Sequence, residues 1–309
     1  MRALVASYEG ARMVHRPALP APAPTDVKIA VRMAGICRTD RYAARCQLDC
    51  PPGRILGHEF AGIVTAVGTR VTDIQLGTRV SVNPLLPCLR CASCTEGRAM
   101  ACEAPQFLGV DLDGAFTEEI IVPQTAVFPV PDVLSWAEAA YVEPVAAALA
   151  VCDAPLSRET RGLIVGDGRI ATLTERVLSA HNFQDIIVAS SADAHHMTDR
   201  FAFVIETNAA TDGLCDILDR VEWGGTVVLK SRPAAPIRLD LARAVSRRLQ
   251  LVGVHYGDFS AAIDLIAGGR LEIGDLLGPE YPLSAHERAF AEDNGRLKRF
   301  LVPDGGLGE

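Results

Sequence analysis

The sequence lacks any uninterrupted apolar run near the ~18 residues that a membrane-spanning helix needs. It also lacks an apolar signal region at its start, where Met1 to Ala6 run directly into strand-like sequence. These absences predict a protein without a membrane partner, located in the cytoplasm.

The sequence also has no excess of positively charged residues. The formal net charge is −8 and the isoelectric point is about 5.4. An acidic surface repels phosphate backbones, so nucleic acid is not expected as a partner. The chain has 309 residues, 49% hydrophobic and 22% charged, which is typical of a globular protein with about two domains.

Nine cysteines are present, but without a secretion signal they do not indicate a disulfide framework. Four of them, Cys88, Cys91, Cys94 and Cys102, have the spacing C-x2-C-x2-C-x7-C. Four thiolates at such intervals can surround one tetrahedral Zn²⁺ and leave no position for water. The spacing therefore predicts a structural zinc site, with an iron–sulfur cluster or four plain cysteines as the alternatives.

The character of the chain changes near residue 143. Before it, short β-rich runs alternate with Gly and Pro, as in a small β-barrel-like domain. After it, strands and helices alternate, which predicts a parallel sheet with helices on both faces. The expected strands are 162–165, 185–189, 201–206, 226–230 and 250–254, and the expected helices are 170–180, 212–221, 239–248 and 259–268. The tail from Pro279, with a helix near 285–292, has no place in that sheet.

Two segments upstream of the four cysteines carry a family resemblance. They are Ala34-Gly-Ile-Cys-Arg-Thr-Asp40 and Gly57-His-Glu-Phe-Ala-Gly62. Together with the four cysteines, Glu143-Pro144 and a later glycine motif, in this order, they resemble the zinc-containing medium-chain dehydrogenases/reductases of the alcohol dehydrogenase type. The resemblance implies an α/β fold with a GroES-like β-barrel catalytic domain (1–145 and 279–309) and a shortened Rossmann domain, a doubly wound parallel sheet (146–278).

The resemblance also implies a catalytic zinc with Cys37, His58 and Glu143 as ligands, and thus two zinc ions per chain. A catalytic zinc needs three protein ligands and an open fourth position. Glu59 resembles the carboxylate that approaches the metal during ligand exchange. Taken alone, a His beside a Glu is more often an ordinary hydrogen-bonded pair, and Glu-Pro is more often a helix start.

Four residues that follow Cys37 in the sequence receive supporting roles. The hydroxyl of Thr39 is the candidate that passes on the substrate proton, with Tyr42 as a second carrier; the alternative is a hydroxyl that caps its own loop. Asp40 is expected to hold the His58 ring. Arg38 resembles an arginine that reaches the cofactor pyrophosphate; the alternative is a solvated charge.

The cofactor motif is Gly166-Asp-Gly168-Arg-Ile170-Ala, which fits G-x-G-x-x-G/A between a strand and a helix. Asp167 is unfavourable near a pyrophosphate unless it points outward. The second strand ends without a carboxylate for the ribose, and Ser190 is a candidate for a 2′-phosphate, so NAD and NADP both stay open.

The Rossmann half is short, because only 14 positions separate Ser190 from Val204. This leaves no room for the usual third strand and predicts a 2-1-4-5-6 sheet that binds dinucleotides weakly or unusually. Two strand ends, Leu229-Lys230 and Val254-His255, resemble the segments that flank the nicotinamide ring.

The leading hypothesis is a zinc-dependent oxidoreductase that interconverts a small alcohol, secondary or polyol-like, and a carbonyl with NAD or NADP. The alternative is a zinc-dependent lyase, isomerase or hydrolase with a degenerate cofactor site, and a third reading is a binding protein without catalysis. Since relatives of this type pair the sheet edge at 250–254, a homodimer or homotetramer is expected.

Overall fold

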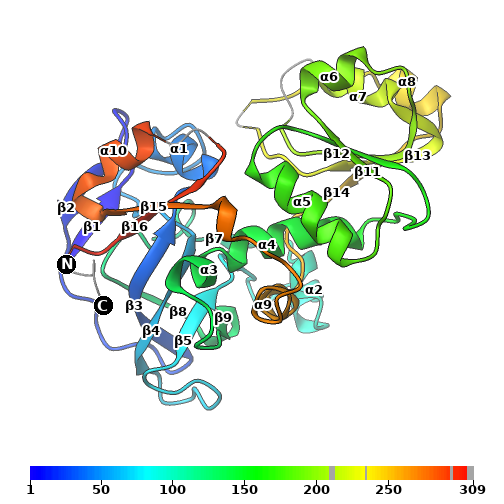
Figure 1. The fold of residues 1–309 in the computed structure, drawn as a ribbon. Coiled ribbons are helices and arrows are strands. Elements are labelled where there is room, and N and C mark those ends of the chain that lie inside the picture. The colour runs from blue at the N-terminus through cyan, green and yellow to red at the C-terminus, as the bar shows by residue number, and fades with distance from the viewer. Residues whose placement is uncertain (209–212, 234, 293–294, 305–309) are drawn as a thin grey trace. The chain divides into compact units, whose positions relative to one another are not determined.

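A computed structural model describes residues 1–208, 213–233, 235–292 and 295–304. The chain divides into two compact units, Met1–Glu143 with Gly274–Glu309, and Pro144–Ile273 (Figure 1). The sequence-based boundaries at 145/146 and 278/279 stay predictions, and parts of the predicted segment 279–309 lie outside the described residues. Within the described residues no helix has the length and apolarity that crossing a bilayer needs.

The first unit is built on a seven-stranded sheet whose main path runs β15-β16-β3-β4-β5-β9, with β8 also paired to β3. Alternation explains its central strand: Val27, Ile29 and Val31 are buried, while Lys28 and Ala30 between them are partly exposed. The strands are β3 (Asp26–Gly35), β4 (Glu59–Val67), β5 (Arg79–Val82), β8 (Glu119–Pro123), β9 (Val127–Pro129), β15 (Leu277–Pro282) and β16 (Lys298–Val302).

Smaller elements complete this unit. Two short antiparallel pairs are β1 (Arg2–Val5) with β2 (Arg12–His15) and β6 (Leu85–Leu86) with β7 (Gln106–Phe107). The helices are α1 (Arg38–Ala44), α2 (Ala92–Thr95), α3 (Trp136–Ala140) and α10 (His286–Ala291), and α4 (Val142–Leu149) continues into the second unit. The tail from Pro279, which had no place in the predicted parallel sheet, thus contributes α10, β16 and the end of β15 to the first unit.

The second unit holds a five-stranded parallel sheet in the order β11-β10-β12-β13-β14. This confirms the predicted 2-1-4-5-6 order. The strands are β10 (Gly162–Val165), β11 (Ile186–Ala189), β12 (Phe201–Glu206), β13 (Val221–Leu229) and β14 (Gln250–Gly253), and the helices are α5 (Arg169–Ala180), α6 (Ser191–His196), α7 (Gly213–Asp219), α8 (Leu241–Ser246) and α9 (Phe259–Ala267). Residue 212, the predicted start of one helix, lies outside the described residues.

The connection between β11 and β12 is short in the structure too. It contains only α6, a six-residue helix that the sequence analysis did not predict, capped by the Ser190 side chain. Where a full Rossmann domain adds a third strand beyond the second, the described sheet ends at β11. Strand β11 is therefore an edge strand, and its residue Val188 is 41% exposed.

Candidate active site and cofactor unit

Two strands of the first unit bring the upstream motifs together. Strand β3 ends at Gly35 and strand β4 begins at Glu59, and the antiparallel register places these two residues opposite each other. Residues just after β3 and just before β4 therefore meet at the same end of the sheet. Cys37, which precedes α1, and His58 come to lie side by side in this way although 21 positions separate them.

The ligand atoms of Cys37, His58 and Glu59 all lie within 4.8 Å of one another. Sulfur, imidazole nitrogen and carboxylate oxygen are the donors that zinc accepts. Glu143 lies in the first turn of α4 and is only 3% exposed, but it is not a member of this group. Its place as third ligand stays a prediction.

Asp40 organises the surroundings of His58. Its carboxylate accepts hydrogen bonds from the backbone N–H groups of Cys37 (2.8 Å) and Gly57 (3.2 Å), and it lies 3.1 Å from Nδ1 of His58. Both side chains are buried, with exposed fractions of 1% and 0%. A carboxylate that accepts from Nδ1 leaves Nε2 as the nitrogen that can face a metal.

Nε2 of His58 is buried and has no hydrogen-bond partner within the described part of the chain. A buried polar atom without a partner is costly, so such an atom calls for an explanation. Burial disfavours the protonated ring, but the charge and hydrogen bond of Asp40 outweigh it and raise the pKa of His58 well above its usual value. The surroundings therefore favour a positive charge at this atom, whether a proton or a metal supplies it.

The other residues of the first motif lie close by. Thr39 Oγ1 is 3.8 Å from Cys37 Sγ, which keeps its hydroxyl beside the three-ligand group. Arg38 is the first residue of α1 and is exposed. Tyr42 follows one turn later on the same helix.

Lys298 is a residue of this site that the sequence analysis missed. It begins β16, is 1% exposed, and pairs with the Glu59 carboxylate. The available signal was a lysine two positions before the apolar run Phe300-Leu301-Val302, since lysine is almost never fully buried unless it is paired.

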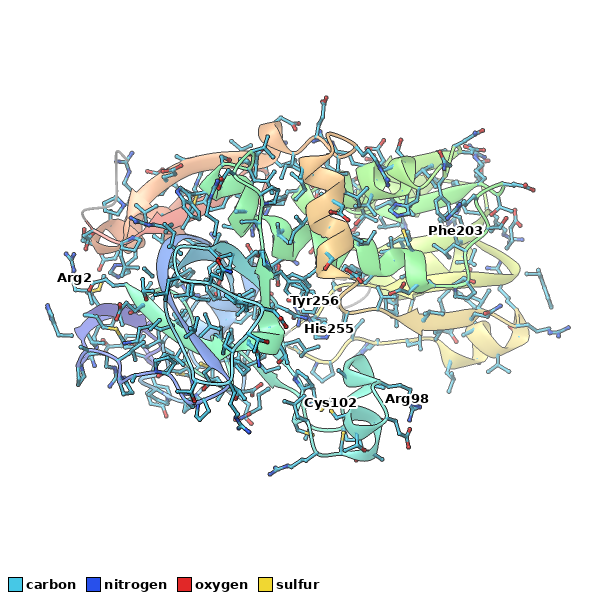
Figure 2. The ribbon with its side chains drawn as sticks, turned by 90° about the horizontal axis from the view of Figure 1, so that it is seen from below. Arg2, Arg98, Cys102, Phe203, His255 and Tyr256 are labelled. Carbon is cyan, nitrogen blue, oxygen red and sulfur yellow. The ribbon has the colours of Figure 1, made fainter. Side chains whose placement is uncertain are left out.

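The four clustered cysteines form a separate lobe around α2. Their sulfur atoms all lie within 4.8 Å of one another, and Cys102 and Arg98 mark the lobe in Figure 2. Backbone N–H groups of Arg90 and Cys91 lower the pKa of Cys88 to about 6, whereas desolvation and neighbouring thiols raise the pKa of Cys94 to about 12. Four thiols that cannot all ionise without a cation fit a tetrahedral zinc.

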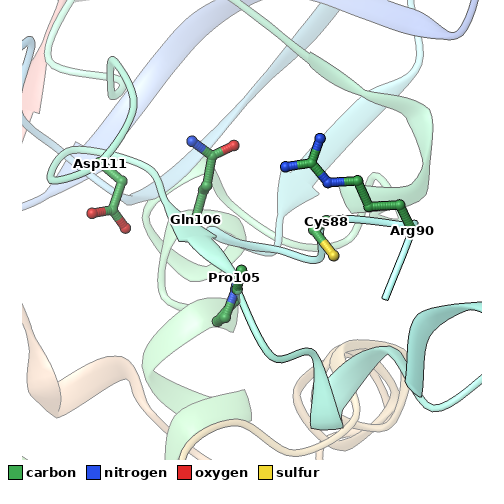
Figure 3. Close-up of a pocket in the computed structure, with 6 residues that line it drawn as sticks. Cys88, Arg90, Pro105, Gln106 and Asp111 are labelled. Atoms are coloured by element: carbon green, nitrogen blue, oxygen red, sulfur yellow. The ribbon is translucent and has the colours of Figure 1, made fainter. Parts of the chain in front are cut away.

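A surface hollow adjoins this lobe, as Figure 3 shows. Its lining combines Cys88 with the opposite charges of Arg90 and Asp111, and the other lining residues are Ala104, Pro105 and Gln106. None of the residues grouped around His58 lines it. We therefore assign it to the lobe and not to the candidate active site.

The glycine motif of the second unit forms the turn between β10 and α5. Gly166 has φ +150°, and a Cβ there would lie 2.1 Å from the Thr207 hydroxyl, so this position requires glycine. Gly168 is the N-cap of α5, and Ile170 is the second residue of the helix. Asp167 is exposed, so its negative charge does not count against a pyrophosphate at this turn.

The strand ends beside this turn hold further polar groups. Ser190 caps α6, and its hydroxyl donates to Asp193 at 2.6 Å. The Val254 N–H donates to the Leu229 carbonyl at 3.2 Å. The residues that directly follow these two also interact, because Lys230 Nζ donates to the His255 carbonyl at 3.2 Å. His255 lies against the Tyr256 ring, with 4.6 Å between the ring centroids (Figure 2).

Glu206, at the end of β12, is a second residue that was not predicted from the sequence as part of a site. It is 2% exposed, and one carboxylate oxygen accepts from the Ser231 hydroxyl at 2.8 Å. Its other oxygen has no hydrogen-bond partner in the described residues. In parallel sheets ligands bind beyond the carboxyl ends of the strands, so this end of the second unit is where a cofactor is expected.

Comparison with known proteins agrees with this geometry. Residues 23–132 match the family model of the alcohol dehydrogenase GroES-like domain. The chain is 27% identical to D-xylulose reductase of Morganella morganii, covering 85% of this chain and 90% of the relative, and 27% identical to L-threonine 3-dehydrogenase of Rhizobium rhizogenes, covering 82% and 83%. A zinc-binding dehydrogenase of Sinorhizobium meliloti, solved with NADP, has the same fold, with a TM-score of 0.87 at 24% identity over 98% of this chain and 99% of that one.

Proposed function

Because this chain is a zinc-containing medium-chain dehydrogenase/reductase of the alcohol dehydrogenase type, we propose that it transfers hydride between a small alcohol and NAD or NADP. The observation that carries the proposal is the group of Cys37, His58 and Glu59, in which the buried His58 Nε2 has no partner among the described residues. The donor types fit zinc. Cys37 and His58 would hold the metal, and the family resemblance assigns Glu143 as the third ligand.

A bound zinc ion lowers the proton affinity of a substrate hydroxyl, as it does for water. The chain supplies the rest. Asp40 keeps the His58 ring in one orientation through Nδ1, and Thr39 holds its hydroxyl 3.8 Å from Cys37 Sγ, where it can accept and pass on the proton. A nicotinamide cofactor held by the second unit would accept the hydride from the alcohol carbon.

We assign the cofactor to the second unit, at the turn formed by Gly166, Gly168 and Ile170 before α5. The N-terminus of this 12-residue helix suits a pyrophosphate. Arg38 is a further candidate contact with the pyrophosphate, and Ser190 is a candidate contact with a 2′-phosphate. Lys230 and His255, next to Leu229 and Val254, are candidates for the nicotinamide side.

The substrate class follows from the relatives' names. D-xylulose reductase and L-threonine 3-dehydrogenase are named for compounds that carry secondary hydroxyl groups. We therefore favour a secondary alcohol or polyol for this chain. A homodimer or homotetramer is part of the proposal, and the cytoplasmic location expected from the sequence stays a prediction.

A panel of secondary alcohols, polyols and ketones, assayed with NAD(H) and NADP(H) by the absorbance of reduced nicotinamide, tests the proposal. At least one pair should turn over, and Cys37→Ser should abolish turnover while the protein stays folded. Cys46→Ser, a thiol in the same region that is not in the ligand group, serves as the control and should keep the activity. Turnover that survives Cys37→Ser would overturn the proposed role of the metal.

The shortened second unit favours one alternative, a zinc-dependent lyase, isomerase or hydrolase. Its described sheet ends at β11, and Ala189 and Ser190 stand where a ribose-binding carboxylate is expected. Turnover that depends on zinc but not on any nicotinamide cofactor would favour this alternative.

A further inference from the structure

The surface hollow beside the four-cysteine lobe has no part in the proposed hydride transfer. Its volume is about 450 Å³, which lies within the range of small-molecule sites. Figure 3 shows Arg90 on one side of the hollow and Asp111 on the other, with Gln106 between them. A hollow with opposite charges on its two sides suits a ligand that itself carries both charges.

The positive side of the hollow belongs to the lobe. Arg90 lies in the loop between Cys88 and Cys91, which a zinc ion bound by the four cysteines would hold in place. Its side chain is exposed and has no ion pair with the residues that the structure describes. A guanidinium carries five N–H donors in a planar fork that matches a carboxylate, so Arg90 can receive the carboxylate of a ligand.

The negative side of the hollow is fixed by a tight turn. The backbone N–H of Asp111 donates to the Phe107 carbonyl at 2.9 Å, and Oδ2 of Asp111 accepts from the Phe107 N–H at 2.7 Å. Its other oxygen, Oδ1, accepts no hydrogen bond within the described part of the chain. Because the carboxylate is already held in one place, it loses little freedom when it binds an ammonium group.

The segment between the two charges supplies the rest of the lining. Ala104 and Pro105 give it an apolar part, against which the methylene groups of a ligand can pack. Gln106 is paired with Leu86 in the short antiparallel sheet, which fixes its backbone. Its side-chain amide holds both a donor and an acceptor, so it can bind either end of a ligand with two charges.

We propose that this hollow binds a small zwitterion, a molecule with a carboxylate at one end and an ammonium group at the other. Arg90 receives the carboxylate, and Asp111 receives the ammonium group. A simple anion would be repelled by Asp111 and a simple cation by Arg90, whereas a zwitterion gains from both contacts. Since ion pairs that face water are weak, we expect dissociation constants on the order of millimolar.

NMR titration of the zinc-loaded protein, without nicotinamide cofactor or alcohol, tests the proposal through the side-chain amide signal of Gln106. The probes are linear ω-amino acids, from glycine to 6-aminohexanoate. One chain length should bind best, and the acid and the amine of that length, with one charge each, should bind about fivefold more weakly. Arg90→Gln and Asp111→Asn should each weaken binding about fivefold. Asparagine keeps an oxygen for the Phe107 N–H, so the turn should persist.

Arg98→Gln and Asp113→Asn are the matched controls, because both residues are exposed, have partners of their own and do not line the hollow. Both variants should bind like the wild type, and so should Cys37→Ser. Loss of binding in Cys37→Ser would place the ligand at the candidate active site and overturn the inference. No saturable binding up to about 0.1 M, or wild-type affinity in Arg90→Gln, would overturn it as well. Since no measurement here uses hydride transfer, failure of the proposed reaction would leave this inference standing.

Discussion

At the scale of single residues, the candidate active site depends on how the Asp40 carboxylate is used. It accepts from two backbone N–H groups, of Cys37 and Gly57, and holds the His58 ring. The backbone contacts fix the carboxylate to the loop that carries Cys37, so the same group positions both expected ligands. A substitution of Asp40 would therefore act on the metal site mainly by displacing Cys37 and His58, and less by removing a negative charge.

His255 provides a prediction about pH. Burial, then the charges of Arg232 and Lys230, lower the pKa of its ring to about 4, and Arg232 Nη1 lies 2.6 Å from its Nε2. In the unfolded chain its pKa is about 6.5. The unfolded state therefore binds the proton first, and the free energy of unfolding should fall by about 2 kcal/mol as the pH drops from about 6.5 to about 4.

NMR titration of the His255 ring and urea unfolding across this range would check the prediction. His255→Asn should make the pH dependence of stability shallower than in the wild type. Arg232→Gln should raise the pKa of His255, because it removes a neighbouring positive charge. A His255 ring that titrates near 6.5 in the folded protein would contradict the assignment.

At the scale of elements, the four-cysteine lobe has almost no core of its own. Helix α2 has four residues and none of them is buried. We expect Cys94→Ser to lose one zinc per chain and to lower the free energy of unfolding by about 2–4 kcal/mol, because the metal replaces the missing apolar core.

Metal analysis and urea unfolding measure both effects. Ser93→Ala, one position earlier on the same helix, is the matched control and should keep two zinc ions per chain and wild-type stability. Equal metal content in Cys94→Ser and the wild type would show that the lobe does not hold zinc.

The short connection between β11 and β12 leads to a prediction about cofactor size. The described sheet has no strand beyond β11, and the Ser190 hydroxyl is engaged with Asp193, so little remains to hold an adenosine. NAD(H) and NADP(H) should bind more weakly than in the micromolar range. Reduced nicotinamide mononucleotide, which lacks adenosine, should bind within about tenfold of NADH.

Fluorescence titration with the three reduced cofactors gives these affinities. Ser190→Ala should change none of them if the hydroxyl only caps α6, whereas weaker binding of NADPH alone would assign Ser190 to the 2′-phosphate. Micromolar binding of NADH, far tighter than that of the mononucleotide, would disprove the prediction.

At the scale of the whole molecule, individual strands could be predicted from the sequence better than contacts between residues that are far apart in the chain. Strands 162–165 and 201–206 agree with β10 and β12 because nearly all of their residues are buried and apolar. Strand β13 begins at Val221 and not at the predicted residue 226, because Glu222, Trp223 and Gly224 are all exposed and the charged residue and the glycine interrupt the apolar run. The pair of Lys298 and Glu59 spans 239 positions, and the strand order that joins them cannot be read from either segment alone.

The last prediction concerns assembly through the other edge of the parallel sheet. Strand β14 is an edge strand in the described sheet, and an exposed strand edge readily pairs with another chain. Gly253 in this strand is exposed, and a Cβ there would meet no atom within 4 Å. Gly253→Glu should thus be accepted by the subunit but place like charges against each other across a two-fold edge contact.

Light scattering after size-exclusion chromatography should show a dimer or tetramer for the wild type and a shift to smaller species for Gly253→Glu. Gly274→Glu is the matched control, since its surroundings are equally open and it lies outside this sheet; it should keep the wild-type mass. If Gly253→Glu keeps the mass of an oligomeric wild type, the chains associate through another surface, and a monomeric wild type would reject assembly altogether.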